Sequence, residues 1–89
     1  MEPQEEVKTA EEVASSIKAA YDSVNLINEV IAGTAMVGES AQEKKDCVDR
    51  NVGHLKIMTG KTWFNDGLTA EQVTEIDTVI TDGEAYIAA

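Results

Sequence analysis

The sequence predicts an all-α fold: a small up-down-up three-helix bundle with a long first helix, completed by oligomerisation. Three observations predict it. They are three helix-capping patterns, apolar residues spaced three and four apart after each pattern, and connections short enough to force antiparallel neighbours. The 89 residues leave room for a single helical domain, residues 1–89. The helices are expected over about residues 9–32, 40–59 and 69–88.

The first helix follows an acidic segment, residues 1–8, that forms either a tail or an extension of the helix. Thr9 begins a capping box with the acid three residues on. One side of the helix carries apolar residues at bundle spacing: Ala10, Val13, Ile17, Ala20, Val24, Ile27 and Ile31. A second stripe, Ala19, Leu26 and Val30, lies on nearly the opposite side. Because a helix that is apolar on two faces is usually buried on both, we expect a subunit partner to cover this stripe. If the chain is a monomer, the loop over residues 33–39, with Met36 and Val37, or the Trp63–Phe64 pair covers it instead.

The second helix begins with a capping pattern at Ser40 and Glu43. Gly53 weakens it by about 1 kcal/mol relative to Ala, so either another backbone approaches there or the helix is simply less stable. Gly33 and Gly60 are expected to end the first two helices in the left-handed conformation. The apolar side of the second helix comprises Ala41, Val48, Val52, Leu55 and Met58.

The third helix begins with a capping box at Thr69 and Gln72. The β-branched run over residues 78–81 is typical of a strand, but the helical pattern extends past it on both sides. We therefore expect a helix there, with an apolar side made of Val73, Ile76, Val79, Ile80, Gly83, Tyr86 and Ile87.

The composition excludes several classes of function. The formal charge of −10 argues against binding to nucleic acid or to an anionic membrane surface, since both need a basic face. One cysteine cannot form an intrachain disulfide, and no apolar run approaches the roughly 20 residues of a membrane span. The acidic start of the chain lacks the layout of a signal peptide, so a cytoplasmic location is expected.

No motif in the sequence predicts an enzyme. Cys47 and His54 are the only soft metal ligands, and zinc would need two more. Seven residues of helix separate them by roughly 10 Å, which is too far for a catalytic pair. The carboxylates fall on solvated helix faces rather than in a convergent pair. We therefore expect no catalytic residue, no metal and no cofactor.

Trp63 and Phe64, in the connection before the third helix, are half of the aromatic residues of the chain. They are interpreted either as a plug that closes the end of the bundle or as an exposed anchor for a partner. Truncating this pair should do more damage than any other change in a loop. The candidate interface therefore comprises Ala19, Leu26, Val30, Trp63 and Phe64.

The cations are concentrated in one segment. Five of the seven Lys and Arg residues fall within residues 44–61, so the second helix is near neutral while the other two helices hold most of the acid. The middle helix then relieves repulsion within or between subunits. The alternative is an acidic surface that imitates DNA, although the acids are not spaced like phosphates.

The segments Val48–Met58, Trp63–Phe64 and Asp82–Ala89 resemble small uncharacterised proteins of marine bacteriophages. The resemblance covers roughly the last 45 residues. It implies a short gene product that is made in the host cytoplasm and associated with the virion. It carries over no catalytic residue.

We therefore expect a non-enzymatic structural or interaction protein that acts by self-association, most simply as an antiparallel dimer with isologous contacts. A domain of this size has a thin core, and few aromatic residues make it thinner. The alternative is a monomeric acidic binding module or inhibitor that docks on a basic protein partner.

Overall fold

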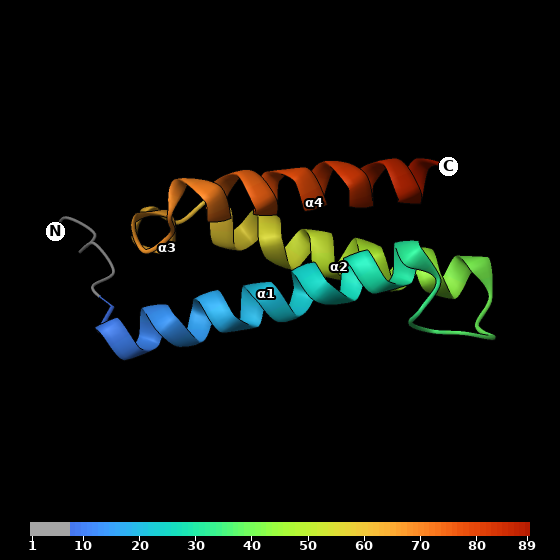
Figure 1. The fold of residues 1–89 in the computed structure, drawn as a ribbon, viewed down its shortest axis with the longest axis horizontal. Coiled ribbons are helices and arrows are strands. Elements are labelled where there is room, and N and C mark those ends of the chain that lie inside the picture. The colour runs from blue at the N-terminus through green and yellow to red at the C-terminus, as the bar shows by residue number, and fades with distance from the viewer. Residues whose placement is uncertain (1–7) are drawn as a thin grey trace, which may run out of the picture.

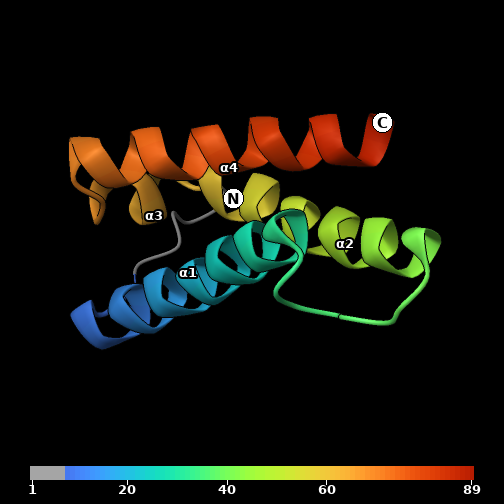
Figure 2. The same cartoon turned by 45° about the vertical axis from the view of Figure 1, so that its right-hand side comes forward.

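A computed structural model describes residues 8–89, so most of the predicted acidic tail lies outside the described residues. The described chain is all-helical and contains no strand, which confirms the predicted class. Its long helices lie side by side and alternate in direction (Figures 1 and 2). The helices are α1 (Ala10–Ala32), α2 (Ala41–Thr59), the single-turn α3 (Thr62–Asp66) and α4 (Ala70–Ala88). The predicted ranges of the long helices agree with these bounds to within one residue.

The helix starts form through contacts between near neighbours. Thr9 Oγ1 accepts from the backbone N–H of Glu12 at 3.1 Å, and Glu12 Oε1 accepts in return from the Thr9 N–H at 3.3 Å. The same reciprocal box closes at Thr69. Ser40 makes half of a box, since its oxygen accepts from the Glu43 N–H while its hydroxyl donates to the Glu43 carboxylate. Each cap satisfies backbone donors that the first helical turn leaves unpaired.

The two predicted glycine stops behave differently. Gly33 ends α1 with φ at +83°, in the left-handed conformation expected of it. Gly60 has φ at −78°, so the prediction of a left-handed residue there is wrong. The N–H groups of Gly60 and Lys61 donate to carbonyls three residues back, which continues the turn and leads the chain into α3.

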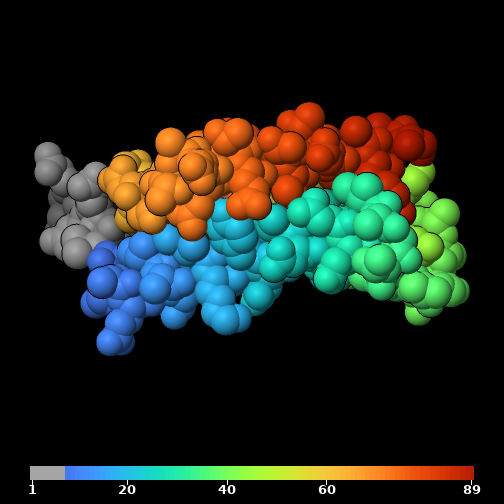
Figure 3. Space-filling view, viewed as in Figure 1, coloured from blue at the N-terminus to red at the C-terminus, as the bar shows by residue number. Residues whose placement is uncertain are grey.

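The core lies where α1 packs against both α2 and α4. In the view of Figure 3, side chains of α1 and α4 meet along one face. Val30 is buried and Ile31 is 39% exposed, so the apolar face of α1 is rotated from the predicted seam near its C-terminal end. Two neighbouring helices cover a broader arc of α1 than one seam would need. The fully buried side chains of largest volume are Phe64, Ile27, Leu55, Ile76, Val24 and Val48.

Close packing of α4 depends on a residue without a side chain. A Cβ at Gly83 would lie 2.5 Å from Val52 Cγ2 and 3.3 Å from Val48 Cγ1. Such distances are shorter than van der Waals contact, so only glycine lets α4 approach α2 this closely.

Within residues 8–89, no helix combines the length and apolar content that a membrane crossing would require.

Candidate association surface

The predicted second stripe of α1 does not form one exposed patch. Ala19 is exposed, Leu26 is half-buried against the core, and Val30 is 2% exposed. Ala35 and Met36, in the loop after α1, also pack against the core to which Val30 belongs. The chain therefore buries Val30 without a second subunit. A contact between subunits at Ala19 and the exposed part of Leu26 stays a prediction.

The aromatic pair divides between the core and the surface. Phe64 has no exposed surface, whereas Trp63 is half-buried and stands edge-on to it, with ring centroids 6.3 Å apart. Lys8 Nζ lies 5.3 Å from the centroid of the Trp63 ring, within range of a cation–π contact. Asn65 Nδ2 donates to the Thr59 carbonyl at 2.7 Å and holds α3 against the end of α2. Phe64 thus has the position expected of a plug, and only Trp63 retains surface for a partner.

The structure exposes an apolar residue of α2 that the sequence analysis missed. Ile57 is 66% exposed, whereas Ile31 and Val73, the other exposed large apolar residues on helices, are only 39% and 38% exposed. At 100° per residue Ile57 lies 180° from the buried Val48, so the same helical arithmetic that predicted the core would have found it. Val37, in the loop after α1, is 77% exposed.

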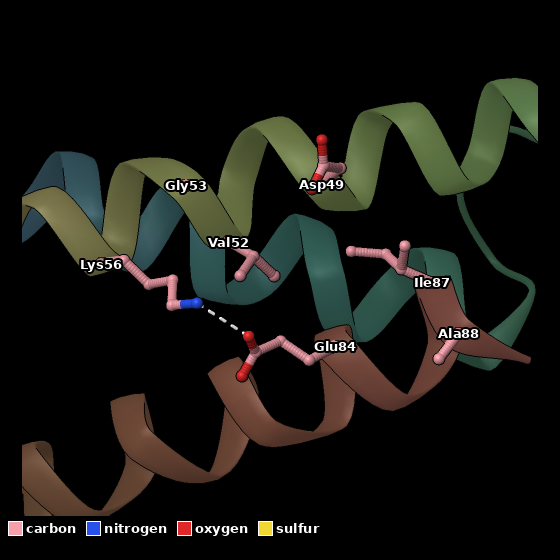
Figure 4. A pocket seen from close by; sticks show the side chains of 7 residues that line it. All are labelled: Asp49, Val52, Gly53, Lys56, Glu84, Ile87 and Ala88. Carbon is pink, nitrogen blue, oxygen red and sulfur yellow. Dashed lines mark hydrogen bonds and ion pairs between the residues drawn. The ribbon is translucent and has the colours of Figure 1, made fainter.

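Beside this face of α2 lies a groove between α2 and α4 (Figure 4), with a volume of about 250 Å³. Val52 of α2 and Ile87 of α4 point into the space between the helices, so its floor is apolar. Lys56 Nζ donates to Glu84 Oε2 at 2.8 Å across it, with both side chains about half exposed. The lining residues are Asp49, Val52, Gly53, Lys56, Glu84, Ile87 and Ala88.

Gly53 borders this groove. The sequence left open whether another backbone approaches Gly53 or whether the glycine only makes α2 less stable. A Cβ built there would meet no atom of the rest of the chain within 4 Å. No other backbone approaches Gly53 in the described chain, so its cost to helix stability has no compensation there. Gly53 and Ile57 are four residues apart and therefore neighbours on one side of α2.

The ionisable groups whose pKa values are shifted lie away from the groove. Burial raises the pKa of Tyr21 to about 12, helped by its hydroxyl, which donates to Glu75 Oε1 at 2.6 Å and links α1 to α4. The Thr9 N–H lowers the pKa of Glu12. A hydrogen bond with the Glu43 side chain raises the pKa of Glu39. Each shift thus has a cause in burial or in a hydrogen bond of the folded chain.

The residues considered for metal binding are not gathered by the fold. Cys47 is a free, buried thiol whose backbone carbonyl accepts from Asn51 Nδ2 at 2.8 Å. Among residues 8–89, no group of three or more His, Cys, Asp or Glu side chains lies close enough to hold a metal ion.

Comparison of the chain with protein-family models, with curated proteins and with solved structures finds no match. The case for function therefore depends on the surface of the molecule itself. The resemblance to bacteriophage proteins stays a prediction.

Proposed function

We propose that the protein acts by self-association, as a helical interaction protein that forms a dimer through the outer face of α2. The observation that carries this proposal is the exposure of Ile57, at 66%, beside an apolar groove. Burying an aliphatic side chain of this size contributes roughly 1.5–3 kcal/mol. In an isologous dimer the gain occurs twice, because both copies bury the same residue.

The distribution of charged residues along the chain also favours an interface on α2. Two chains that each carry −10 repel one another, so an interface is least costly where the acid density is lowest. Residues 44–61 hold five cations and two acids, whereas residues 62–89 hold six acids and no cation. The segment that contains α2 is therefore the part of the molecule with the least repulsion between copies.

We place this activity in the setting that the bacteriophage resemblance implies. The protein would be made in the cytoplasm of the host and serve as an accessory or virion-associated component. Self-association suits such a role, because a short chain gains binding surface by forming a symmetric assembly.

The test compares Ile57→Glu with Thr78→Glu, which adds the same charge on the exposed outer side of α4. Size-exclusion chromatography with light scattering at micromolar concentrations should show a salt-insensitive dimer for the wild type and for Thr78→Glu. Ile57→Glu should be a monomer with unchanged helicity by circular dichroism. A monomeric wild type, or a dimer that survives Ile57→Glu, would contradict the proposal.

A second candidate function is favoured by the acid on α4. Its helix carries Glu71, Glu75, Asp77, Asp82 and Glu84 without any cation. In this alternative the protein is a monomeric module or inhibitor that docks on a basic protein. The monomer would then bind a cationic protein with an affinity that falls steeply with added salt, which isothermal calorimetry would measure.

A further inference from the structure

We infer that Met36 anchors the loop over residues 33–39 to the core and is a site of reversible oxidation: a hydroperoxide that converts its thioether to the sulfoxide releases the loop. The inference does not rest on the proposed self-association, because this loop joins α1 to α2 and is separate from the outer face of α2. The backbone conformation of Met36, its hydrogen bonding and the packing of its side chain each favour this role.

The backbone of Met36 has a conformation that residues with a side chain seldom adopt. Among residues 8–89, Met36 is the single residue other than glycine with a positive φ, at 54°. In this left-handed region the Cβ comes close to the following carbonyl oxygen, and an apolar side chain offers no local hydrogen bond in compensation. Such a residue persists only where the surrounding structure holds it in place. A contact with another part of the fold therefore stabilises the conformation of Met36.

Backbone hydrogen bonds hold the two ends of the loop but not the N–H of Met36. The Ala35 N–H donates to the Glu29 carbonyl at 3.2 Å, which secures the start of the loop to the end of α1. The Glu39 N–H donates to the Met36 carbonyl at 3.1 Å, and Gly38 in this turn has φ at +89°, as a type II turn requires. Within residues 8–89 the Met36 N–H donates to no protein acceptor. Met36 therefore joins two ordered turns, and no hydrogen bond at its own N–H fixes its φ.

The side chain of Met36 supplies the restraint that the N–H lacks. It is half-buried and packs, with Ala35, against the core cluster that contains Val30. Because the N–H makes no hydrogen bond, this apolar contact is what holds the left-handed backbone in place. Half burial also leaves part of the side chain in contact with solvent, where a small oxidant reaches it.

Oxidation changes this side chain from apolar to polar. The thioether sulfur attacks one oxygen of hydrogen peroxide, the O–O bond breaks and an S–O bond forms, so that sulfur loses two electrons and the peroxide gains them. The second oxygen leaves as hydroxide, which takes the proton from the transferred oxygen and becomes water. The product is a polar sulfoxide, and its burial among apolar side chains without a hydrogen-bond partner is unfavourable.

Release of the loop follows from this change in polarity. Once the oxidised side chain leaves the core, nothing compensates for the left-handed backbone, so the two turns separate from the core together. The open loop exposes apolar core surface at the end of α1, where Ile31 is already 39% exposed. The chain thereby gains an apolar binding surface in its oxidised form alone.

The test treats the protein with hydrogen peroxide and follows the loop by NMR relaxation, while peptide mass spectrometry identifies the oxidised residues. Before treatment the backbone order parameters of residues 34–39 should be near the rigid value of about 0.85. Conversion of Met36 to the sulfoxide should lower them to below about 0.6. Treatment with methionine sulfoxide reductases should then restore the original values.

Met58 provides the matched control. It is also half-buried against the core, but it lies within α2, where backbone hydrogen bonds hold its conformation whatever its side chain contacts. Met36→Leu keeps an apolar side chain that peroxide does not oxidise, so its loop should stay ordered after treatment, whereas Met58→Leu should respond as the wild type does. Met36→Gln places a polar group of similar length in the loop and should release it without any oxidant, whereas Met58→Gln should not.

Four outcomes would overturn the inference. The loop could be mobile before treatment, or its order parameters could stay near about 0.85 after Met36 is converted to the sulfoxide. The Met36→Leu loop could lose its order in peroxide, which would place the sensitive group elsewhere, at Met58 or Cys47. Finally, Met36 could resist an amount of peroxide that oxidises Met58.

Discussion

The two faces of α2 use the same kinds of residue for different purposes. On the inner face Val48, Val52 and Leu55 are buried, and Gly83 of α4 lies against the side chains of Val48 and Val52. On the outer face Ile57 is 66% exposed and Gly53 has open space around it. A missing side chain is thus required for packing at Gly83 and serves no contact within the described chain at Gly53.

This difference separates folding from association. Substitutions on the inner face change contacts that the folded chain makes with itself, so they should change the free energy of unfolding. Substitutions on the outer face remove no contact within the folded chain, so apart from differences in helix propensity they should alter only the contact between copies. Measurements of unfolding at concentrations where the chain is monomeric therefore test the comparison directly.

The largest expected effect comes from truncating the inner face. Leu55→Ala should lower the free energy of unfolding by about 2–5 kcal/mol, because Leu55 is fully buried and its removal leaves a cavity. Ile57→Ala, two residues further on and on the outer face, should change it by no more than about 0.5 kcal/mol. Chemical denaturation followed by circular dichroism measures both values, and equal losses would remove the distinction between the two faces.

Gly83→Ala should destabilise the chain by about 1–3 kcal/mol, because its methyl group would lie 2.5 Å from Val52 Cγ2. The higher helix propensity of alanine offsets part of this loss. Adding Val52→Ala removes the clashing atoms, so the double variant should lose less than the two single losses combined. Additive losses in a double-mutant cycle would show that Val52 does not limit the approach of α4.

The same substitution on the outer face should have the opposite sign. Gly53→Ala should raise the free energy of unfolding by up to about 1 kcal/mol, since the new methyl group meets nothing and helix propensity alone decides the result. Thermal unfolding of the monomeric chain provides the measurement. A decrease in the melting temperature would mean that Gly53 has a packing role inside the folded chain.

The smallest expected effect concerns pH. The pKa of Tyr21 is raised from its ordinary value of 10.0 to about 12, so the folded chain keeps a proton that the unfolded chain loses. Stability from this group is complete below pH 10 and falls as the pH rises through about 12. Tyr21→Phe should flatten this part of the unfolding profile, whereas Tyr86→Phe should retain it. An unchanged slope in the Tyr21 variant would contradict the raised pKa of Tyr21.

The helix boundaries could be predicted from the sequence because they depend on residues close together in the chain. The Thr9 and Thr69 caps use partners three positions on, and the β-branched run at residues 78–81 is helical because the surrounding pattern continues through it. The candidate surface could be predicted only in part. Trp63 retains exposed surface, but Val30 and Phe64 are buried, and Ile57 was not singled out.

The sequence by itself determined the helical class, the bounds of the long helices and the left-handed stop at Gly33, since local hydrogen bonds and backbone preferences decide these features. Only the tertiary structure decided which apolar residues are buried. Val30 is buried, in a core against which the loop residues Ala35 and Met36 also pack, while Ile31 of the predicted seam is 39% exposed. The tertiary structure alone also separates Gly83 from Gly53, because the space around a glycine depends on neighbours that lie far away in the sequence.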